Sequence, residues 1–233
     1  MAVAIAACNF AASLFCYSFA IVPFTLDAFT KWRPFLFHIT SVNNVAAIRS
    51  ARCLQCADVI LKSSRERSLL REHRKSSCIV HSGNAAIRLQ SQAPLHAGNI
   101  AFDKNWTLNG LIEYLNGFVF FWPGTEAGPC NYGRNHFASS SWDRHPINVL
   151  RIPAATVFSP ESCNRPYFCR FNSGAPRCYN GRQSPRGRNT FLPHDEFDGT
   201  LARVAEVVFR GGVALPDKTE LASSPDGPWK PFF

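Results

Sequence analysis

The chain has 233 residues, which is enough for one substantial domain with its own hydrophobic core. A hydrophobic content of 46% with 13% aromatic residues excludes a generally disordered chain. The net charge of +9 is concentrated in residues 31–104 and 151–190, whereas residues 191–233 are acidic overall. Arginine-rich zones of this kind favour contact with a polyanion such as a nucleic acid. A solvated basic surface without a partner is the alternative.

The first 30 residues are almost uncharged, with Asp27 as their single charged group. An apolar run of this length could span a membrane or direct export. A signal peptide normally begins with positive charge, however, and this stretch has none. We therefore expect a cytoplasmic protein, with membrane association through residues 1–27, or export, as the alternative.

The next elements follow from local pattern. Residues 34–40 indicate a short buried strand, and Ser41 or Asn43 would cap a helix running through residues 43–61. The highly charged residues 62–75 indicate an exposed helix or loop.

Residues 107–122 permit two interpretations. The Asn116-Gly117 pair between apolar runs is typical of a β-hairpin. Leucine and isoleucine at positions 108, 111, 112 and 115 instead follow helical spacing, with Thr107 as a cap and Gly117 as the end. We favour a helix followed by a strand over residues 118–122, because the aromatic residues concentrate after Gly117.

The C-terminal half begins with a predicted strand over residues 147–152 and continues into a long loop over residues 159–195, which is rich in Pro, Gly and Arg. The segment 203–212 then surrounds one carboxylate, Glu206, with apolar residues. A helix would expose Glu206, whereas a strand would put it on a face with Val204 and Val208. Both remain open on this pattern.

Several cysteines have metal-ligand spacing. Cys53 and Cys56 form a C-x2-C pair, and Cys78 with His81 forms a C-x2-H pair, so the four together could form a zinc site. Buried reduced thiols are the simpler interpretation, and we expect no metal. Cysteines 130, 163, 169 and 178 could form disulfides if the chain were exported.

Three blocks taken together resemble a known enzyme group. The segments FHITSVNNVAAI (37–48), NGFVFFW (116–122) and VAEVVF (204–209) are similar to blocks of the NAD-dependent DNA ADP-ribosyltransferase toxins that modify thymidine. The middle of the chain is closer to an uncharacterised bacterial domain family, through IRLQSQAPL, LNGFVFFWPG, FNSGAPR, SPRGRNTFLP and VAEVVFRGGVALPD. The resemblance therefore covers about residues 34–217.

The resemblance implies an α+β fold of the ADP-ribosyltransferase-like split β-sandwich type, with flanking helices and NAD in the cleft. We accordingly expect a domain over residues 34–217, a hydrophobic N-terminal extension over 1–33 and a C-terminal tail over 218–233. It also implies that Glu206 lies on a strand and that Cys53 and Cys56 fall inside the first helix.

Site residues carried over by the resemblance fall into three groups. Glu206 would stabilise the oxocarbenium-like transition state, and Arg88 would be a second catalytic or phosphate-contacting group. The residues that would bind NAD are His38, Thr40, Asn44, Phe121 and Trp122. The loop that would meet the target contains Asn172, Ser173, Arg182, Arg186 and Arg188.

The leading hypothesis is therefore an NAD-dependent ADP-ribosyltransferase, a transferase of the glycosyltransferase class, that modifies a nucleic-acid base or a protein. One alternative is a catalytically inactive module of the same fold that binds nucleic acid through its basic zones. Another is the Cys3His zinc protein described above.

Overall fold

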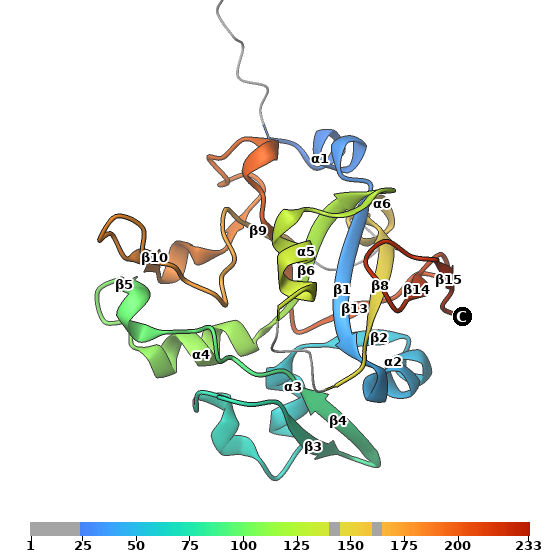
Figure 1. Cartoon of the computed structure of the whole chain (residues 1–233), viewed down its shortest axis with the longest axis horizontal. Helices are drawn as coiled ribbons and strands as arrows, with labels where there is room; N and C mark the ends of the chain where they lie inside the picture. Colours follow the sequence, from blue (N-terminus) through green and yellow to red (C-terminus); the bar gives the residue numbers. More distant parts are fainter. Residues whose placement is uncertain (1–23, 140–144, 160–164) are drawn as a thin grey trace, which may run out of the picture.

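A computed structural model describes residues 24–139, 145–159 and 165–233 (Figure 1). They form a mixed α/β fold with one large antiparallel sheet and several short helices, which agrees with the expected α+β class. The α-helices are α1 Leu26–Trp32, α2 Val45–Ala51, α3 Ala57–Lys62, α4 Leu108–Asn116, α5 Asn131–Phe137 and α6 Ala154–Val157. Short 3-10 helices are η1 Val42–Asn44, η2 Arg67–Leu70, η3 Ala97–Asn99, η6 Arg188–Thr190 and η7 Leu201–Arg203.

The large sheet has the strand order β11-β9-β12-β6-β1-β8-β14-β15, and β7 pairs with β6. Its strands are β1 Phe35–Ser41, β6 Phe118–Thr125, β7 Gly128–Pro129, β8 Ile147–Pro153, β9 Pro166–Cys169, β11 Leu192–Pro193, β12 Glu206–Arg210, β14 Glu220–Ala222 and β15 Lys230–Pro231. Three smaller pairs are β2 Cys53–Gln55 with β13 Gly212–Ala214, β3 Cys78–Ser82 with β4 Ala85–Leu89, and β5 Ile100–Phe102 with β10 Ser184–Arg186.

Strand β6 belongs to two pairings along its length. Its first half, Phe118–Phe121, pairs with β12, whereas Trp122–Gly124 pairs with β1. Beyond Phe37, β1 therefore continues along β8 alone and separates from β6. This separation opens the sheet between β1 and the first half of β6, and the cavity described below lies there.

Local sequence signals located several elements correctly. The side chain of Thr107 accepts a hydrogen bond from the Gly110 backbone, α4 ends at Asn116 before Gly117, and β6 follows at once, so the helix–strand prediction is confirmed. Ser41 caps the turn that leads into α2. The strand predicted around residues 147–152 is β8, and Glu206 begins strand β12 rather than lying on a helix.

The helix predicted over residues 43–61 is broken in two. Arg52 has a left-handed backbone with φ of 48°, which ends α2, and Cys53 then starts β2. Strand β2 pairs with β13, and the backbone N–H of Cys56 donates to the carbonyl of Gly211. Pairing with the chain's C-terminal part therefore overrides the helical pattern, and Cys53 and Cys56 lie outside the first helix.

Both flanks of the expected domain contribute to the core. Within the predicted extension, α1 buries Phe29 completely in the main hydrophobic cluster. The predicted tail instead adds β14 to β8, and Phe232, at 1% exposure, lies in the same cluster. Residues 1–23 lie outside the described part of the chain. Within the described part, no helix is both long enough and apolar enough to cross a membrane.

The cysteines do not form a metal cluster in the residues that the structure describes, where no group of three or more potential ligands gathers. Cysteines 53, 56, 78, 130, 169 and 178 are free thiols, and Cys163 is not among the described residues. The Cys3His alternative therefore gains no support from the arrangement of the four residues on which it was based.

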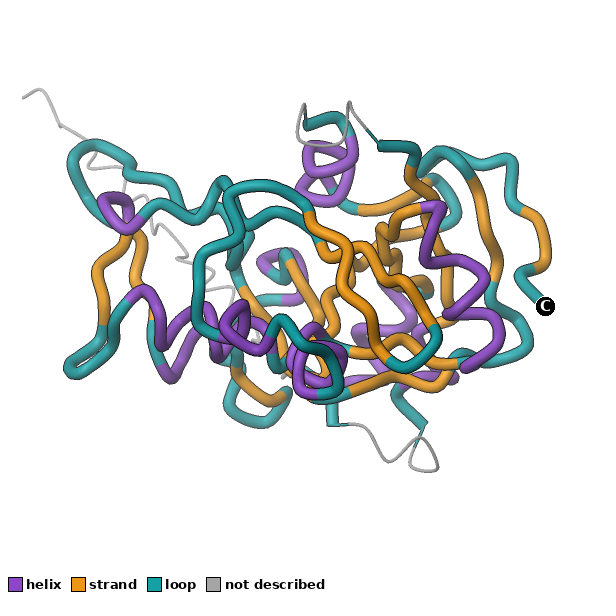
Figure 2. Tube along the Cα trace, turned by 90° about the horizontal axis from the view of Figure 1, so that it is seen from below, coloured by secondary structure: helices purple, strands orange, loops and turns teal. Residues whose placement is uncertain are grey.

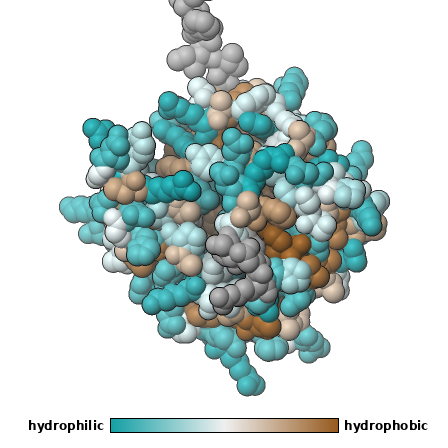
Figure 3. Space-filling model, viewed as in Figure 1, coloured by the Kyte–Doolittle hydropathy of each residue, from teal (hydrophilic) through white to brown (hydrophobic). Residues whose placement is uncertain are grey.

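The long loop predicted over residues 159–195 contains a core strand that the sequence did not reveal. Strand β9 pairs with both β12 and β11, and Phe168 is buried beside Phe29. The part after β9 runs out to the β5–β10 pair, which projects at one end of the molecule (Figures 1 and 2). Figure 3 shows hydrophobic residues exposed just right of the centre of one face, with hydrophilic residues beyond them.

Candidate functional site

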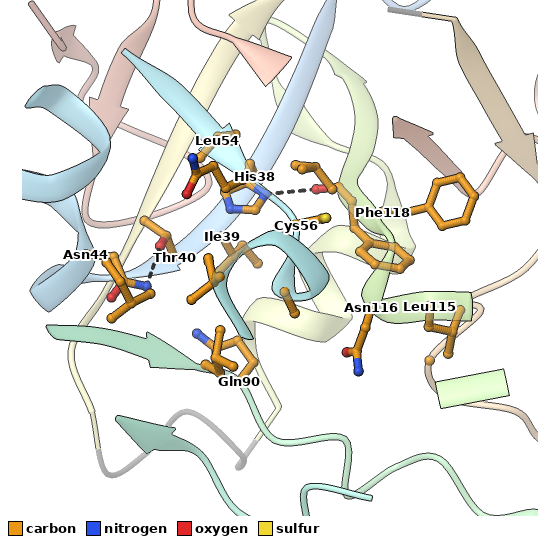
Figure 4. Close-up of a pocket in the computed structure, with 18 of the residues that line it drawn as sticks. His38, Ile39, Thr40, Asn44, Leu54, Cys56, Gln90, Leu115, Asn116 and Phe118 are labelled. Atoms are coloured by element: carbon orange, nitrogen blue, oxygen red, sulfur yellow. Dashed lines mark hydrogen bonds between the residues drawn. The ribbon is translucent and has the colours of Figure 1, made fainter. Parts of the chain in front are cut away.

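A cavity of about 310 Å³ lies where β1 and β6 separate. Its wall is formed by β1, α2, β4, the first half of β6, and the residues around 172–174 and 206. Figure 4 shows His38 and Leu54 on one side of it, and Gln90 and Asn116 on the other. The volume is at the lower end of the range for small-molecule sites.

Glu206 is the only carboxylate among the described residues that line this cavity. It begins β12, is 2% exposed, and receives a hydrogen bond from the backbone N–H of Ser173, 3.2 Å from each carboxylate oxygen. Burial raises the pKa of Glu206 to about 7, and hydrogen bonding from Ser173 and the charge of Arg186 oppose this rise only in part. A carboxyl group with a pKa near neutrality is typical of a functional position.

Arg186 is buried behind this carboxylate and does not extend to the surface. The guanidinium donates to the carbonyls of Asn172 (2.9 Å) and Ser173 (3.1 Å), and it lies 4.0 Å from the ring centre of Phe171. Its exposure is 1%. The expected role as a contact for the target is therefore corrected, because Arg186 instead fixes the loop segment that binds Glu206.

His38 lies at the point where β1 leaves β6. Its Nδ1 is 2.9 Å from the carbonyl oxygen of Phe120, which can only accept, so Nδ1 carries the proton (Figure 4). Burial lowers the pKa of His38, so the ring is neutral at pH 7 and Nε2 is an acceptor. This hydrogen bond holds β1 and β6 together where their backbone pairing has ended.

Trp122 and His136 stack beside the same cavity, with ring centres 4.7 Å apart and planes 30° apart. Burial lowers the pKa of His136 to about 4, and the neighbouring His38 adds to this shift. The indole N–H of Trp122 is buried and has no acceptor among the residues that the structure describes. These rings give the cavity a flat, uncharged aromatic wall.

Asn44 ties the start of the helix to β4. Its amide accepts from the backbone N–H of Arg88 at 2.8 Å and donates to the Arg88 carbonyl at 3.0 Å. The same amide lies 3.3 Å from the Thr40 hydroxyl (Figure 4). The Arg88 side chain donates to Ser77 and lies beside His145, both at 3.3 Å, and its buried Nε has no partner in the described residues.

Most of the residues expected from the sequence meet at this cavity. Both expected catalytic residues, Glu206 and Arg88, line it. Two residues of the expected target loop, Asn172 and Ser173, also line it. The expected NAD-binding residues that line it are His38, Thr40, Asn44 and Trp122. Those that do not line it are Phe121, Arg182, Arg186 and Arg188.

Phe121 belongs to the main hydrophobic core and is fully buried, whereas Phe120 faces the cavity. The expectation that two neighbouring residues would form one stacking surface is therefore wrong for Phe121. Strand alternation would have favoured Phe120 with Trp122, because residues two apart share a face. His136, Arg74 and Asn116 also line the cavity. His136 and Arg74 lie outside every block of the resemblance, and Asn116 begins the block NGFVFFW but was not expected at the site.

The sequence model of a family of unknown function (DUF7002) matches residues 34–219. The curated proteins contain no match to this chain. The family match spans the strands and loops that form the cavity, from β1 to the residues after β13.

Proposed function

The chain belongs to DUF7002, a family of unknown function, and we propose that this chain is an NAD-dependent ADP-ribosyltransferase with Glu206 at its catalytic centre. The observation that carries the proposal is the position of Glu206. This carboxylate is buried at a strand start, it lines the cavity together with the neutral His38, and it has one backbone donor. The resemblance of the blocks around His38, Trp122 and Glu206 to the DNA-modifying toxins supports the same assignment.

The proposed function requires a matching fold. An ADP-ribosyltransferase-like split β-sandwich needs two sheets that diverge around a cleft. The change of partner along β6, from β12 at Phe118–Phe121 to β1 at Trp122–Gly124, supports this arrangement. The cavity beside the point of divergence supports it further.

The reaction would break the bond between C1′ of the ribose and the nitrogen of nicotinamide. Nicotinamide leaves with the bonding electron pair, and C1′ then forms a bond with a nucleophilic atom of the target, whose proton is released. Positive charge develops on the ribose in the transition state. The ionised Glu206 stabilises that charge more than it stabilises the uncharged ribose of the ground state, which accelerates the reaction.

The lining residues fit the parts of NAD as a substrate. Trp122, His136 and Phe120 would offer an aromatic wall for the nicotinamide ring. The indole N–H of Trp122, which has no acceptor among the described residues, would gain one from the ligand. His38 would accept a hydrogen bond from a ribose hydroxyl through Nε2.

The target is proposed to be a nucleic-acid base or a protein with an anionic surface. The net charge of +9 favours an anionic partner. Arg182 and Arg188 lie exposed on the loop that continues from the Ser173 segment. That loop continues from the cavity-lining residues 172–174 to β10, which pairs with β5.

The test is the release of nicotinamide from NAD by the full chain, with water as the nucleophile at C1′ when no target is present. Glu206→Gln is expected to lower the rate by about 10² or more, because it removes the charge that stabilises the transition state. Glutamine has the same shape and is neutral, so the buried site tolerates it. Glu196→Gln, at an exposed acid, is the matched control and is expected to have the wild-type rate.

Equal rates for wild type and Glu206→Gln would refute the proposed role of Glu206. If no nicotinamide is released but nucleic acid binds with strong salt dependence, the alternative of a non-catalytic binding module is correct.

A further inference from the structure

Arg74 is a buried cation that the proposed chemistry does not use. It is 7% exposed and lies after η2, outside every block that carried the resemblance. The guanidinium donates from Nε to the Gln90 carbonyl (3.2 Å), from Nη1 to the Leu69 carbonyl (3.3 Å) and from Nη2 to the side-chain oxygen of Asn116 (3.0 Å). Three of its five N–H groups are thus engaged.

All three acceptors are neutral. No carboxylate in the described part of the chain forms an ion pair with Arg74. Arginine stays protonated in proteins, so this residue cannot remove its charge by losing a proton. A buried charge without a counter-charge is unfavourable, and neutral hydrogen bonds compensate for it only in part. The missing counter-charge would come from a ligand.

Arg74 lines the same cavity as Glu206. Its partners Gln90 and Asn116 lie across the cavity from His38 (Figure 4). Arg88, two residues before Gln90, also lines the cavity and has an unpartnered Nε among the described residues. The lining therefore holds two arginines against the single carboxylate Glu206, and its positive charge lies on the β4 side.

We infer that the β4 side of the cavity, formed by Arg74, Arg88, Gln90 and Asn116, binds a phosphate group of the ligand. The fork of a guanidinium matches the oxygens of a phosphate, and the site is already held in place by three hydrogen bonds. The inference rests on the proposed function, since NAD carries a pyrophosphate. Binding of the phosphate itself requires no turnover.

The experiment measures binding of ADP-ribose and inorganic pyrophosphate to the full chain by calorimetry, with adenosine as an uncharged reference. Arg74→Gln is expected to weaken ADP-ribose and pyrophosphate binding by about 10-fold or more, the scale of one hydrogen bond to a charged group. Adenosine binding is expected to stay unchanged. Lys75→Gln removes the same charge at the next, exposed residue and is expected to have wild-type affinity for all three.

Because Arg74 also holds Leu69, Gln90 and Asn116 together, its glutamine variant could fail to fold. Arg74→Lys, which keeps the charge, and the NMR signal of the Arg74 Nε–H in the wild type then provide the test. Pyrophosphate is expected to shift that signal, and the lysine variant to bind more weakly than wild type and more tightly than any folded glutamine variant.

An Arg74 signal that pyrophosphate does not move, or a folded Arg74→Gln variant with unchanged ADP-ribose affinity, would overturn the inference. The outcome is separable from that for the proposed function. Nicotinamide release at an unchanged KM in Arg74→Gln would overturn only the phosphate site. Pyrophosphate binding at Arg74 without any NAD turnover would overturn only the enzymatic proposal.

Discussion

The backbone N–H of Ser173 lies 3.2 Å from both carboxylate oxygens of Glu206. On the other side of the same residue, the Ser173 carbonyl accepts from Arg186 at 3.1 Å. A loop after β9 thus fixes the side chain that begins β12, and a buried arginine fixes the loop. The carboxylate therefore has a defined orientation before any ligand arrives, which is the condition for electrostatic catalysis.

The first prediction concerns the pH dependence of turnover. Only the ionised form of Glu206 stabilises positive charge, and its pKa is raised to about 7 by burial. The kcat/KM for nicotinamide release is therefore expected to rise with pH and to level off above about pH 8, with a midpoint near this pKa. Steady-state kinetics over a series of buffers at constant ionic strength measures the profile. A midpoint near 4.5, the ordinary value for a glutamate, would contradict a buried catalytic carboxyl.

The same shift predicts how stability depends on pH. Because the folded-state pKa of Glu206 lies above its unfolded value of 4.5, its protonated form is favoured in the folded state. The stability that it contributes is full below pH 4.5 and is lost as the pH rises through about 7. Wild type loses this stability as the pH rises, whereas Glu206→Gln has no carboxyl group to ionise. The unfolding free energy of Glu206→Gln minus that of wild type is therefore expected to increase by on the order of 3 kcal/mol from acidic to alkaline pH, at 1.36 kcal/mol per pKa unit. Urea unfolding at both pH values measures this increase, and Glu196→Gln should show none.

Substitution of Arg186 tests whether this residue positions Glu206. Arg186→Gln removes a charge that lowers the pKa of Glu206 and also releases the Asn172 and Ser173 carbonyls, so the pKa is expected to rise further. NMR titration of the Glu206 carboxyl carbon measures the change without requiring activity. Arg188→Gln, at an exposed arginine of the same loop, is the control. A purely structural role would lower stability and leave the titration midpoint where it is.

The elements that sequence could predict are those set by neighbours in the chain. Thr107 caps α4 and Gly117 ends it, and both signals act within one helical turn. The break at Arg52 could not be predicted in this way, because a non-glycine residue adopts a left-handed backbone there only to allow β2 to pair with β13. Strand β9 was hidden for a similar reason, since its four residues have no alternation and acquire strand geometry from β12 and β11.

The candidate site also contains some residues that the sequence could predict and others that it could not. The residues around His38 and Glu206 were predicted from sequence blocks that lie inside the family match. Arg74 and Arg186 have their roles through backbone carbonyls distant in sequence, and composition gives no sign of which arginine among many is buried. Both are buried guanidiniums with neutral acceptors, a state that only the folded structure reveals.

The C-terminal segment is predicted to be required for stability, although it lies beyond the family match. Phe232 is 1% exposed and packs in the main cluster, whereas its neighbour Phe233 is 38% exposed. Phe232→Ala is expected to cost about 3–5 kcal/mol in unfolding free energy, the usual range for removing a core phenylalanine. Phe233→Ala is expected to cost less, because this ring is 38% exposed and is not part of the main cluster. Denaturant unfolding of both variants makes the comparison, and a loss for Phe232→Ala as small as that expected for Phe233→Ala would show that Phe232 is not part of the stabilising core.

The last prediction concerns target recognition at the tip of the loop that follows the Ser173 segment. Tyr179 and Arg182 exchange backbone hydrogen bonds across a two-residue turn, and Tyr179 is 78% exposed between the exposed Arg177 and Arg182. An aromatic ring flanked by arginines is suited to stacking on an unpaired base. Tyr179→Ala is therefore expected to weaken binding of a single-stranded oligonucleotide by about 10-fold, within the 1–3 kcal/mol typical of one stacked base, while nicotinamide release without target stays unchanged. Tyr132→Ala, at a tyrosine on α5 that is 44% exposed, is the control. Fluorescence anisotropy at fixed salt measures the affinities, and equal affinity of wild type and Tyr179→Ala would exclude the loop tip as a nucleic-acid contact.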